Sequence, residues 1–194
     1  MIKKENFIGY LNHEYCPVIR ELTKALLLET IASKKPKNLL EIGTFVGYSA
    51  AVMLEADKDL KIVSLEKDPQ NAKDAKQNLE NLGFEKRAEV VCCDAIDYLE
   101  THQDEKFDFV FLDGPKGQYF KYLPYIKKML NGGGVLFADD ILYYGLVNSE
   151  EKIIHKHRSI VNNLRKFIDQ IKTDEDFDTQ IYDIEDGVSI SIKK

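Results

Sequence analysis

The sequence contains few cysteines, and their spacing builds no covalent or metal-held framework. Its 194 residues include only three cysteines, which are Cys16 and the adjacent pair Cys92 and Cys93. An odd number of cysteines without a Cys-x-x-Cys pair argues against both a disulfide scaffold and a zinc site. We therefore expect reduced thiols, which are typical of a cytosolic protein.

Long hydrophobic runs are also missing from the sequence. Its first residues, MIKKENFIGYLNHEY, include neither the apolar core nor the small-residue cleavage site of a signal peptide. No stretch approaches the roughly 20 apolar residues that a membrane-spanning helix needs. We therefore expect a cytoplasmic protein.

Positive charge is not in excess either. Lysine and arginine number 27 against 33 aspartates and glutamates, which leaves a net charge of −6. A uniformly basic nucleic-acid-binding face is not expected, although a local basic patch needs only a few well-placed side chains. Hydrophobic residues make up 44% of the chain and charged residues 31%, as in an ordinary soluble globular protein. The length predicts one domain, residues 1–194.

Short apolar runs alternate with amphipathic stretches from about residue 38 onward. The runs that predict strands are 38–43, 60–66, 88–93, 107–113 and 135–138. The stretches that predict helices are 47–55, a segment that begins at Pro69 and ends at 81–83, and 118–130. The sequence NGGG at 131–134 predicts a turn. Strands that alternate with helices are typical of βαβ units in a parallel sheet.

The two ends of the chain depart from this alternation. Residues 1–37 are predicted to form a helical amino-terminal extension, and residues 150–172 form one long helical pattern. Alternating strand patterns at 179–184 and 188–192 flank Glu185-Asp186-Gly187, and Asp-Gly between such runs is a hairpin signal. We therefore predict an α/β protein with a mostly parallel seven-stranded sheet that ends in an antiparallel carboxyl-terminal hairpin.

A glycine loop follows the first predicted strand. Its sequence, EIGTFVGYS, contains the spacing G-x-x-x-G from Gly43 to Gly47. Glycines allow the backbone to turn sharply and to approach a ligand closely. The spacing is neither the G-x-G-x-x-G of a dinucleotide site nor that of a P-loop, so NAD, FAD and nucleoside triphosphates are disfavoured as ligands.

Acidic residues follow the next two predicted strands. Glu66 ends the second strand, where an acid typically accepts hydrogen bonds from ribose hydroxyls. Asp94 follows the third strand, where an adenine could be held. With Gly43 and Gly47, these acids describe a nucleoside pocket without a phosphate cradle, which fits S-adenosylmethionine. The alternative is that the glycines only permit close helix–strand packing and that the acids are solvated strand ends.

Three aspartates end the fourth and fifth predicted strands. Asp113 follows one strand, and Asp139 and Asp140 follow the other. Adjacent strands lie about 4.8 Å apart, so these ends can converge. Crowded carboxylates raise one another's pKa unless a cation lies among them, and ligand sets made only of oxygen select Mg²⁺, with Ca²⁺ or Mn²⁺ also compatible. Alternatively, each aspartate caps the element that follows it.

A lysine follows Asp113 in the sequence DGPKGQY. Pro115 restricts this loop, and the glycines on either side of Pro115-Lys116 let it turn tightly. Near a metal ion and a sulfonium, like charge would disfavour the ammonium form of Lys116, so that the amine could act as a general base. The alternative is an ordinary surface lysine.

These segments resemble one enzyme family. LLEIGTFVGYSA, VSLEKD, CCDA, FVFLDGPKGQY and FADDILYYGLV resemble, in this order, the motifs of metal-dependent catechol O-methyltransferase-like enzymes, from about Tyr15 to the end of the chain. DGPKGQY, KHRSIVNNLRKF and EDGVSIS look most like the bacterial tRNA 5-hydroxyuridine methyltransferases, which make 5-methoxyuridine at the tRNA wobble position. The resemblance implies a Rossmann-like class I methyltransferase fold, S-adenosylmethionine as cofactor, and a homodimer.

The resemblance also implies roles for individual residues. Asp113, Asp139 and Asp140 match the metal ligands, and Lys116 matches the catalytic base. The positions that match contacts to S-adenosylmethionine are Ile19, Gly43, Ser49, Glu66, Asp94 and Asp113. Asp140 stands where the family usually has asparagine, which adds a negative charge to the site. The amino-terminal segment is short for the family, so we expect part of the substrate lid to be missing.

The metal site alone cannot select the substrate, because a catechol and 5-hydroxyuridine both offer two neighbouring oxygens to a metal ion. The residues around the opening of the site, its rim, must therefore select the substrate. The resemblance favours 5-hydroxyuridine in tRNA, with a small catechol or phenolic as the alternative. The predicted basic groups are Lys152, His155, Lys156, His157, Arg158, Arg165 and Lys166, and separately Lys34, Lys35 and Lys37. Tyr119, Tyr143 and Tyr144 could stack on a base. The alternative for the basic helix is an amphipathic helix whose charged face is merely solvated. A further alternative for the whole chain is a non-catalytic module that binds S-adenosylmethionine.

Overall fold

The computed structural model describes residues 2–10 and 18–194 of the chain. This part of the chain divides into two compact units, Met1–Tyr98 and Leu99–Lys194. Cys16, one of the predicted reduced thiols, and the stretch 11–17 of the predicted helical extension lie outside the described residues. Cys92 and Cys93 are free thiols, as predicted.

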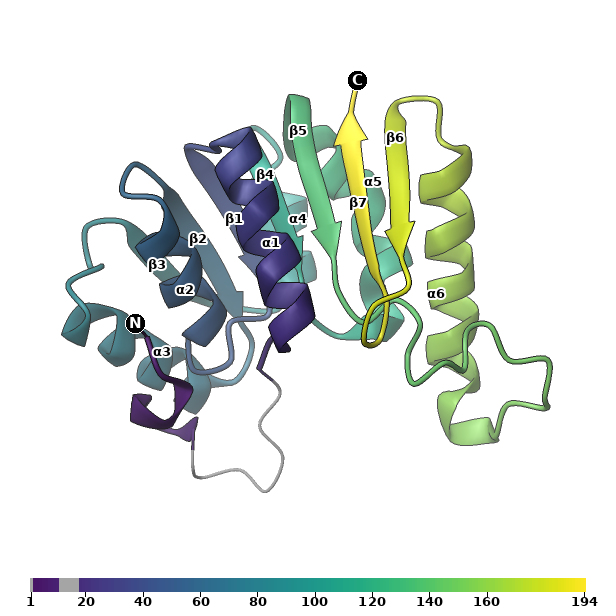
Figure 1. Cartoon of the computed structure of the whole chain (residues 1–194), viewed down its shortest axis with the longest axis horizontal. Helices are drawn as coiled ribbons and strands as arrows, with labels where there is room; N and C mark the ends of the chain where they lie inside the picture. Colours follow the sequence, from purple (N-terminus) through teal and green to yellow (C-terminus); the bar gives the residue numbers. More distant parts are fainter. Residues whose placement is uncertain (1, 11–17) are drawn as a thin grey trace. The chain divides into compact units, whose positions relative to one another are not determined.

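The first unit contains three parallel strands separated by helices (Figure 1). β1 pairs with β2, and β2 pairs with β3, so the predicted βαβ alternation is confirmed. Its elements in chain order are a 3-10 turn η1 (Lys4–Asn6), α1 (Glu21–Lys34), β1 (Asn38–Ile42), α2 (Tyr48–Ala56), β2 (Lys61–Glu66), α3 (Pro69–Asn81) and β3 (Ala88–Cys92). The helix α4 (Ala95–Thr101) spans the junction of the two units.

The start of α3 shows how the sequence specifies a helix end. Pro69 is the first residue of the helix, where its missing N–H costs no hydrogen bond. The Asp68 carboxylate accepts hydrogen bonds from the backbone N–H groups of Gln70 and Asn71, both at 2.9 Å. This cap satisfies two of the donors that a helix leaves unpaired at its amino end.

The second unit contains the predicted antiparallel end of the sheet. β4 and β5 pair in parallel, whereas β7 pairs antiparallel with both β5 and β6. Its elements are β4 (Phe107–Leu112), a 3-10 turn η3 (Lys116–Gln118), α5 (Tyr119–Met129), β5 (Leu130–Ala138), α6 (His155–Thr173), β6 (Phe177–Tyr182) and β7 (Val188–Lys193). The predicted carboxyl-terminal hairpin is thus confirmed.

Buried aromatic side chains pack together in β4 and β5 and hold the ends of these two strands in place. Phe109, Phe111 and Phe137 are fully buried. The Phe137 ring centroid lies 6.3 Å from that of Phe109 and 5.8 Å from that of Phe111. Interiors packed in this way resist displacement, so the backbone just beyond both strands is held in a defined position.

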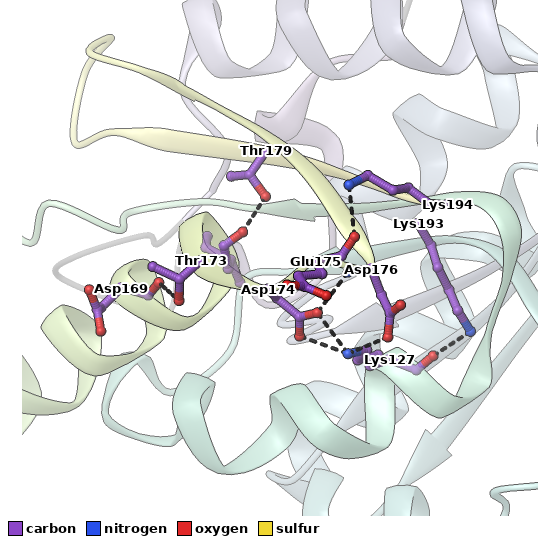
Figure 2. A network of polar contacts seen from close by, with 10 residues as sticks. Lys127, Asp169, Thr173, Asp174, Glu175, Asp176, Thr179, Lys193 and Lys194 are labelled. Atoms are coloured by element: carbon purple, nitrogen blue, oxygen red, sulfur yellow. Dashed lines mark hydrogen bonds and ion pairs between the residues drawn. The ribbon is translucent and has the colours of Figure 1, made fainter.

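A network of lysines and acidic residues fastens the end of the second unit (Figure 2). The Lys127 ammonium lies 2.8 Å from Asp174 and 2.7 Å from Asp176, which precede β6. The Lys193 ammonium donates to the Lys127 carbonyl oxygen at 2.8 Å. Burial alone would raise the pKa of Asp174, but hydrogen bonds from Lys127 outweigh it and lower that pKa. The network ties the turn between α6 and β6, and the last strand, to the end of α5.

Three sequence predictions about secondary structure differ from the structure. Of the predicted helical extension 1–37, only α1 is α-helical among the described residues. Residues 131–134 belong to β5 and form no turn between elements. A Cβ added at Gly134 would lie 2.9 Å from the Asn131 carbonyl oxygen and 3.2 Å from that of Asp108, so the glycine permits a close backbone approach within a strand. The helix α4 has no predicted counterpart, because its seven residues are too few for a clear helical period.

Within residues 2–10 and 18–194, no helix combines the length and the apolar composition needed to cross a membrane.

Candidate functional site

Three carboxylates converge at the carboxyl ends of β4 and β5. Asp113 follows β4, and Asp139 and Asp140 follow β5. The two strands are parallel neighbours with Leu112 opposite Ala138, which places the residues after them side by side. One carboxylate oxygen from each aspartate lies within 4.8 Å of the others. The predicted meeting of these three side chains is confirmed.

Lys116 reaches into this carboxylate cluster. Its ammonium nitrogen lies 2.5 Å from Asp113 Oδ1 and 3.2 Å from Asp140 Oδ2, and its side chain is 16% exposed. The loop that carries it is held by the Asn163 side chain, which donates to the Gly117 carbonyl oxygen at 3.0 Å. Lys116 is therefore a partly buried member of the cluster and not an ordinary surface lysine.

The cluster perturbs the protonation of its own members. Burial of Asp139, reinforced by the charges of Asp113 and Asp140, raises the pKa of Asp139 to about 8. Burial lowers the pKa of Lys116, but the charges of Asp113, Tyr119 and Asp140 outweigh burial, so this pKa lies well above its usual value. The predicted weakening of the ammonium form of Lys116 concerns a site that holds a metal ion and a sulfonium, and it stays a prediction.

The donor set fits a hard divalent cation. All three donors are carboxylate oxygens, the ligands that Mg²⁺, Mn²⁺ and Ca²⁺ prefer. Neighbouring oxygens around Mg²⁺ lie about 3 Å apart and opposite ones about 4.2 Å apart, so an oxygen spacing within 4.8 Å needs only a small inward shift. Burial is the main cause of the raised pKa of Asp139, and the negative charges of Asp113 and Asp140 add to it, whereas the Lys116 ammonium lowers it. Asp113, Asp139 and Asp140 are thus the residues that could hold such an ion.

The first unit contains the predicted glycine loop and its acidic partner. Gly43 and Gly47 have φ values of +102° and +84°, which glycine adopts without strain. The Phe45 N–H donates to Glu66 Oε2 and the Asp68 N–H donates to Glu66 Oε1, both at 2.8 Å. The loop after β1 therefore binds the acid at the end of β2.

Glu41 is a buried acid that the sequence analysis missed. It is 0% exposed, and Ser49 Oγ donates to its carboxylate at 2.5 Å. Ser64 Oγ also donates to this carboxylate, and it lies 2.5 Å from Thr44 Oγ1. Ser49, a predicted cofactor contact, is thus oriented by Glu41. An acid inside the otherwise apolar strand NLLEI was the signal that could have identified it.

Two further predicted cofactor contacts of the first unit are Asp94 and Ile19. Asp94 accepts a hydrogen bond from Lys67 at 2.6 Å, and the Lys67 side chain is 75% exposed. An ion pair that exposed contributes little stability. Ile19 is buried, with 5% of its surface exposed.

The structure changes the predicted rim of the site. Tyr119 is 0% exposed and donates to the Leu112 carbonyl oxygen at 3.0 Å, so the prediction that it could stack on a base is wrong. Arg165 donates to the carbonyl oxygens of Val147 and Ser149, each at 2.9 Å, and thereby holds a loop. The predicted basic residues with exposed side chains are Lys34, Lys35, Lys37, Lys152, His155, Lys156, Arg158, Arg165 and Lys166.

Comparison with known proteins identifies the family. The sequence model of a family described as O-methyltransferase matches residues 20–194. This chain belongs to the O-methyltransferase family. Within the family it is similar to "O-methyltransferase imqG" of Aspergillus flavus, with 31% identity over 152 residues, 75% of this chain and 61% of the relative. It is similar to a catechol O-methyltransferase of Niastella koreensis, with 32% identity over 59% of this chain and 53% of the relative. The matched part thus spans less than two thirds of either relative.

A solved structure places this O-methyltransferase family member in a known fold. A Staphylococcus aureus protein assigned as a caffeoyl-CoA O-methyltransferase superposes with a TM-score of 0.85 and 28% identity, over 92% of this chain and 86% of that protein. The predicted Rossmann-like methyltransferase fold, with seven strands that are mostly parallel and antiparallel at the carboxyl end, is confirmed.

Proposed function

We propose that this chain is an S-adenosylmethionine-dependent O-methyltransferase that uses a divalent cation to methylate a small substrate with two neighbouring oxygens, such as a catechol or related phenolic. The observation that carries the proposal is the cluster of Asp113, Asp139 and Asp140 with Lys116 beside it. Membership in the O-methyltransferase family supports the reaction class. Relatives named for catechol and caffeoyl-CoA support a small substrate over tRNA.

The residues of the first unit support S-adenosylmethionine as the methyl donor. The glycine loop has no side chain at Gly43, whereas a Cβ at Gly47 would meet Ala75 at 3.3 Å, so Gly47 permits close packing against α3. The carboxylate of Glu66 has lone pairs left for ribose hydroxyls after it accepts two backbone N–H groups. Glu41 orients the hydroxyl of Ser49, which lies in the first turn of α2, directly after this loop. This set suits a nucleoside whose other end carries no phosphate.

The reaction is an in-line displacement in which a substrate oxygen attacks the methyl carbon and S-adenosylhomocysteine leaves. Orientation of the reactants can supply roughly 7–11 kcal/mol of such a barrier. A divalent cation bound to the three aspartates would supply the charge that holds two neighbouring oxygens and lowers the pKa of the reacting hydroxyl. When the charge of the aspartates is balanced, the pKa of Lys116 falls, so that Lys116 can release its proton to solvent and the neutral amine can accept the proton of the substrate hydroxyl. The Lys116 ammonium formed in that transfer then stabilises the negative charge on the substrate oxygen.

One observation favours the second candidate function, methylation of 5-hydroxyuridine in tRNA. Lys152, His155, Lys156 and Arg158 are exposed at the amino-terminal end of α6 and just before it, and Tyr144 is 68% exposed. Basic side chains can contact phosphates, and an exposed aromatic ring can stack on a base. Tyr119 and the guanidinium of Arg165 are already engaged within the fold, which leaves a smaller surface for RNA than the sequence predicts.

The two candidates differ in the substrate that is methylated. The purified chain is incubated with S-adenosylmethionine and Mg²⁺ and either catechol or tRNA that contains 5-hydroxyuridine, and the products are measured by mass spectrometry. Metal-dependent methylation of catechol that added tRNA leaves unchanged supports our proposal, whereas 5-methoxyuridine in tRNA without methylated catechol supports the second candidate. Asp140→Ala is the matched variant, and it should lose the metal-dependent turnover. Tight cofactor binding with no metal-dependent turnover on any vicinal diol would support a non-catalytic binding module.

A further inference from the structure

The loop that follows β5 has an unusual backbone. Asp140, Tyr143 and Tyr144 have φ values of 55°, 46° and 57°, in the left-handed region that residues other than glycine rarely adopt. Such conformations persist only where the surrounding structure holds them. Because Asp140 is a candidate metal ligand at the start of this loop, whatever holds the loop also sets the position of its carboxylate.

The turn between β6 and β7 makes the contacts that hold this loop. The Ile141 N–H donates to the Gly187 carbonyl oxygen at 3.0 Å, and the Leu142 N–H donates to the Asp186 carbonyl oxygen at 2.8 Å. The Tyr144 N–H donates to Asp186 Oδ1 at 2.5 Å. Three of the four N–H groups that directly follow Asp140 are thus paired with two adjacent residues of one turn.

Asp186 is more buried than an aspartate in a turn usually is. Aspartate before glycine is a common turn pair, and such a side chain usually lies in solvent. Asp186 is only 6% exposed, and its carboxylate faces the loop. Gly187 also lies against the loop, because a Cβ at this position would be only 2.3 Å from Leu142 Cγ. A buried carboxylate is costly unless it is hydrogen-bonded, and the hydrogen bond from the Tyr144 N–H offsets the cost of burying the Asp186 carboxylate.

We propose that Asp186 is a positioning residue, which holds the loop after β5 in its left-handed conformation and so fixes the Asp140 carboxylate for divalent-cation binding. The inference rests on the proposed function for the role of Asp140, although the contact to the loop stands without it. Asp186 acts through the Tyr144 N–H and does not itself join the carboxylate cluster. The far end of the loop is fastened separately by Arg165, and the N–H groups of Ile141 and Leu142 keep their backbone acceptors, so loss of the Asp186 carboxylate should loosen the middle of the loop at Tyr144 and reach Asp140 through it.

The test compares Asp186→Ala and Asp186→Asn with Asp183→Ala, a matched control at an exposed aspartate in the same hairpin. Mn²⁺ binding is measured by electron paramagnetic resonance with Mn²⁺ alone, and backbone amide hydrogen exchange is followed over residues 141–147. Loss of a group that orients a metal ligand typically weakens metal binding about 10- to 100-fold, and we expect this range for Asp186→Ala. We also expect faster exchange at Tyr144 in that variant.

The other variants separate positioning from general loss of structure. Asp186→Asn keeps an oxygen that can accept from the Tyr144 N–H, so it should bind Mn²⁺ more tightly than Asp186→Ala, and Asp183→Ala should match the unmodified chain. Saturating Mn²⁺ should restore methyl transfer to Asp186→Ala. If Asp186→Ala does not fold, Asp186→Asn carries the comparison with the same readouts.

Unchanged Mn²⁺ affinity together with unchanged exchange at Tyr144 in the Asp186 variants would overturn the inference. Failure of the proposed function looks different, because the unmodified chain and Asp140→Ala would then bind Mn²⁺ equally weakly. In that case faster exchange in the Asp186 variants would still support Asp186 as the residue that holds the loop, and unchanged exchange would still reject it.

Discussion

The raised pKa of Asp139 predicts how pH controls both stability and metal binding. In the unfolded chain an aspartate ionises near its ordinary value of 3.8, whereas burial and two neighbouring carboxylates raise the pKa of folded Asp139 to about 8. Between these values the folded state holds a proton that the unfolded state has lost, so folding becomes less favourable as pH rises. The loss amounts to at most about 1.4 kcal/mol per pH unit across this window, and it ends above the folded pKa.

Metal binding should show the opposite trend. A carboxylate must lose its proton before it binds a cation, so the affinity for Mn²⁺ should rise about tenfold per pH unit up to about pH 8 and then level off. Urea denaturation in the presence of a chelator at several pH values measures the stability, and Mn²⁺ titration at the same values measures the affinity. Asp139→Asn removes the titrating group and should flatten the stability profile. If that variant and the unmodified chain lose stability in parallel as pH rises, the reasoning is refuted.

Three further predictions follow from the same contacts. Lys116→Met should lower kcat about 10²- to 10⁴-fold with little change in the KM for S-adenosylmethionine, which steady-state kinetics would measure. Glu41→Ala should destabilise the fold by about 2–4 kcal/mol in urea denaturation, because the buried Ser64 hydroxyl and the half-buried Ser49 hydroxyl lose an acceptor, and Glu41→Gln should cost less. Lys127→Met should cost about 1–2 kcal/mol at neutral pH. Since the folded pKa of Asp174 is lowered, this cost should be present above the ordinary pKa of 3.8 and shrink as the solution is acidified further.

Local pattern alone was enough to predict the alternation of strands and helices and the convergence of the aspartates. Strand and helix periods differ, and caps such as Asp68-Pro69 mark helix ends, so these features can be read from neighbouring residues. The carboxyl ends of parallel neighbouring strands share one edge of a sheet, so aspartates placed after β4 and β5 must lie close together once that pairing is recognised. The hairpin around Asp186-Gly187 was predicted for the same local reason.

Only the tertiary structure decided burial, protonation and the pairing of distant residues. The direction of the Lys116 pKa shift depends on which charges surround the ammonium, and Tyr119 is hidden by packing that no local pattern reveals. Asp186 contacts Tyr144 across 42 residues of sequence, and Glu41 meets Ser64 across 23. The free energy of a buried charge depends on all the groups that the fold brings around it. Residue type and spacing therefore identified the groups that could do chemistry, while packing determined their charge and their partners.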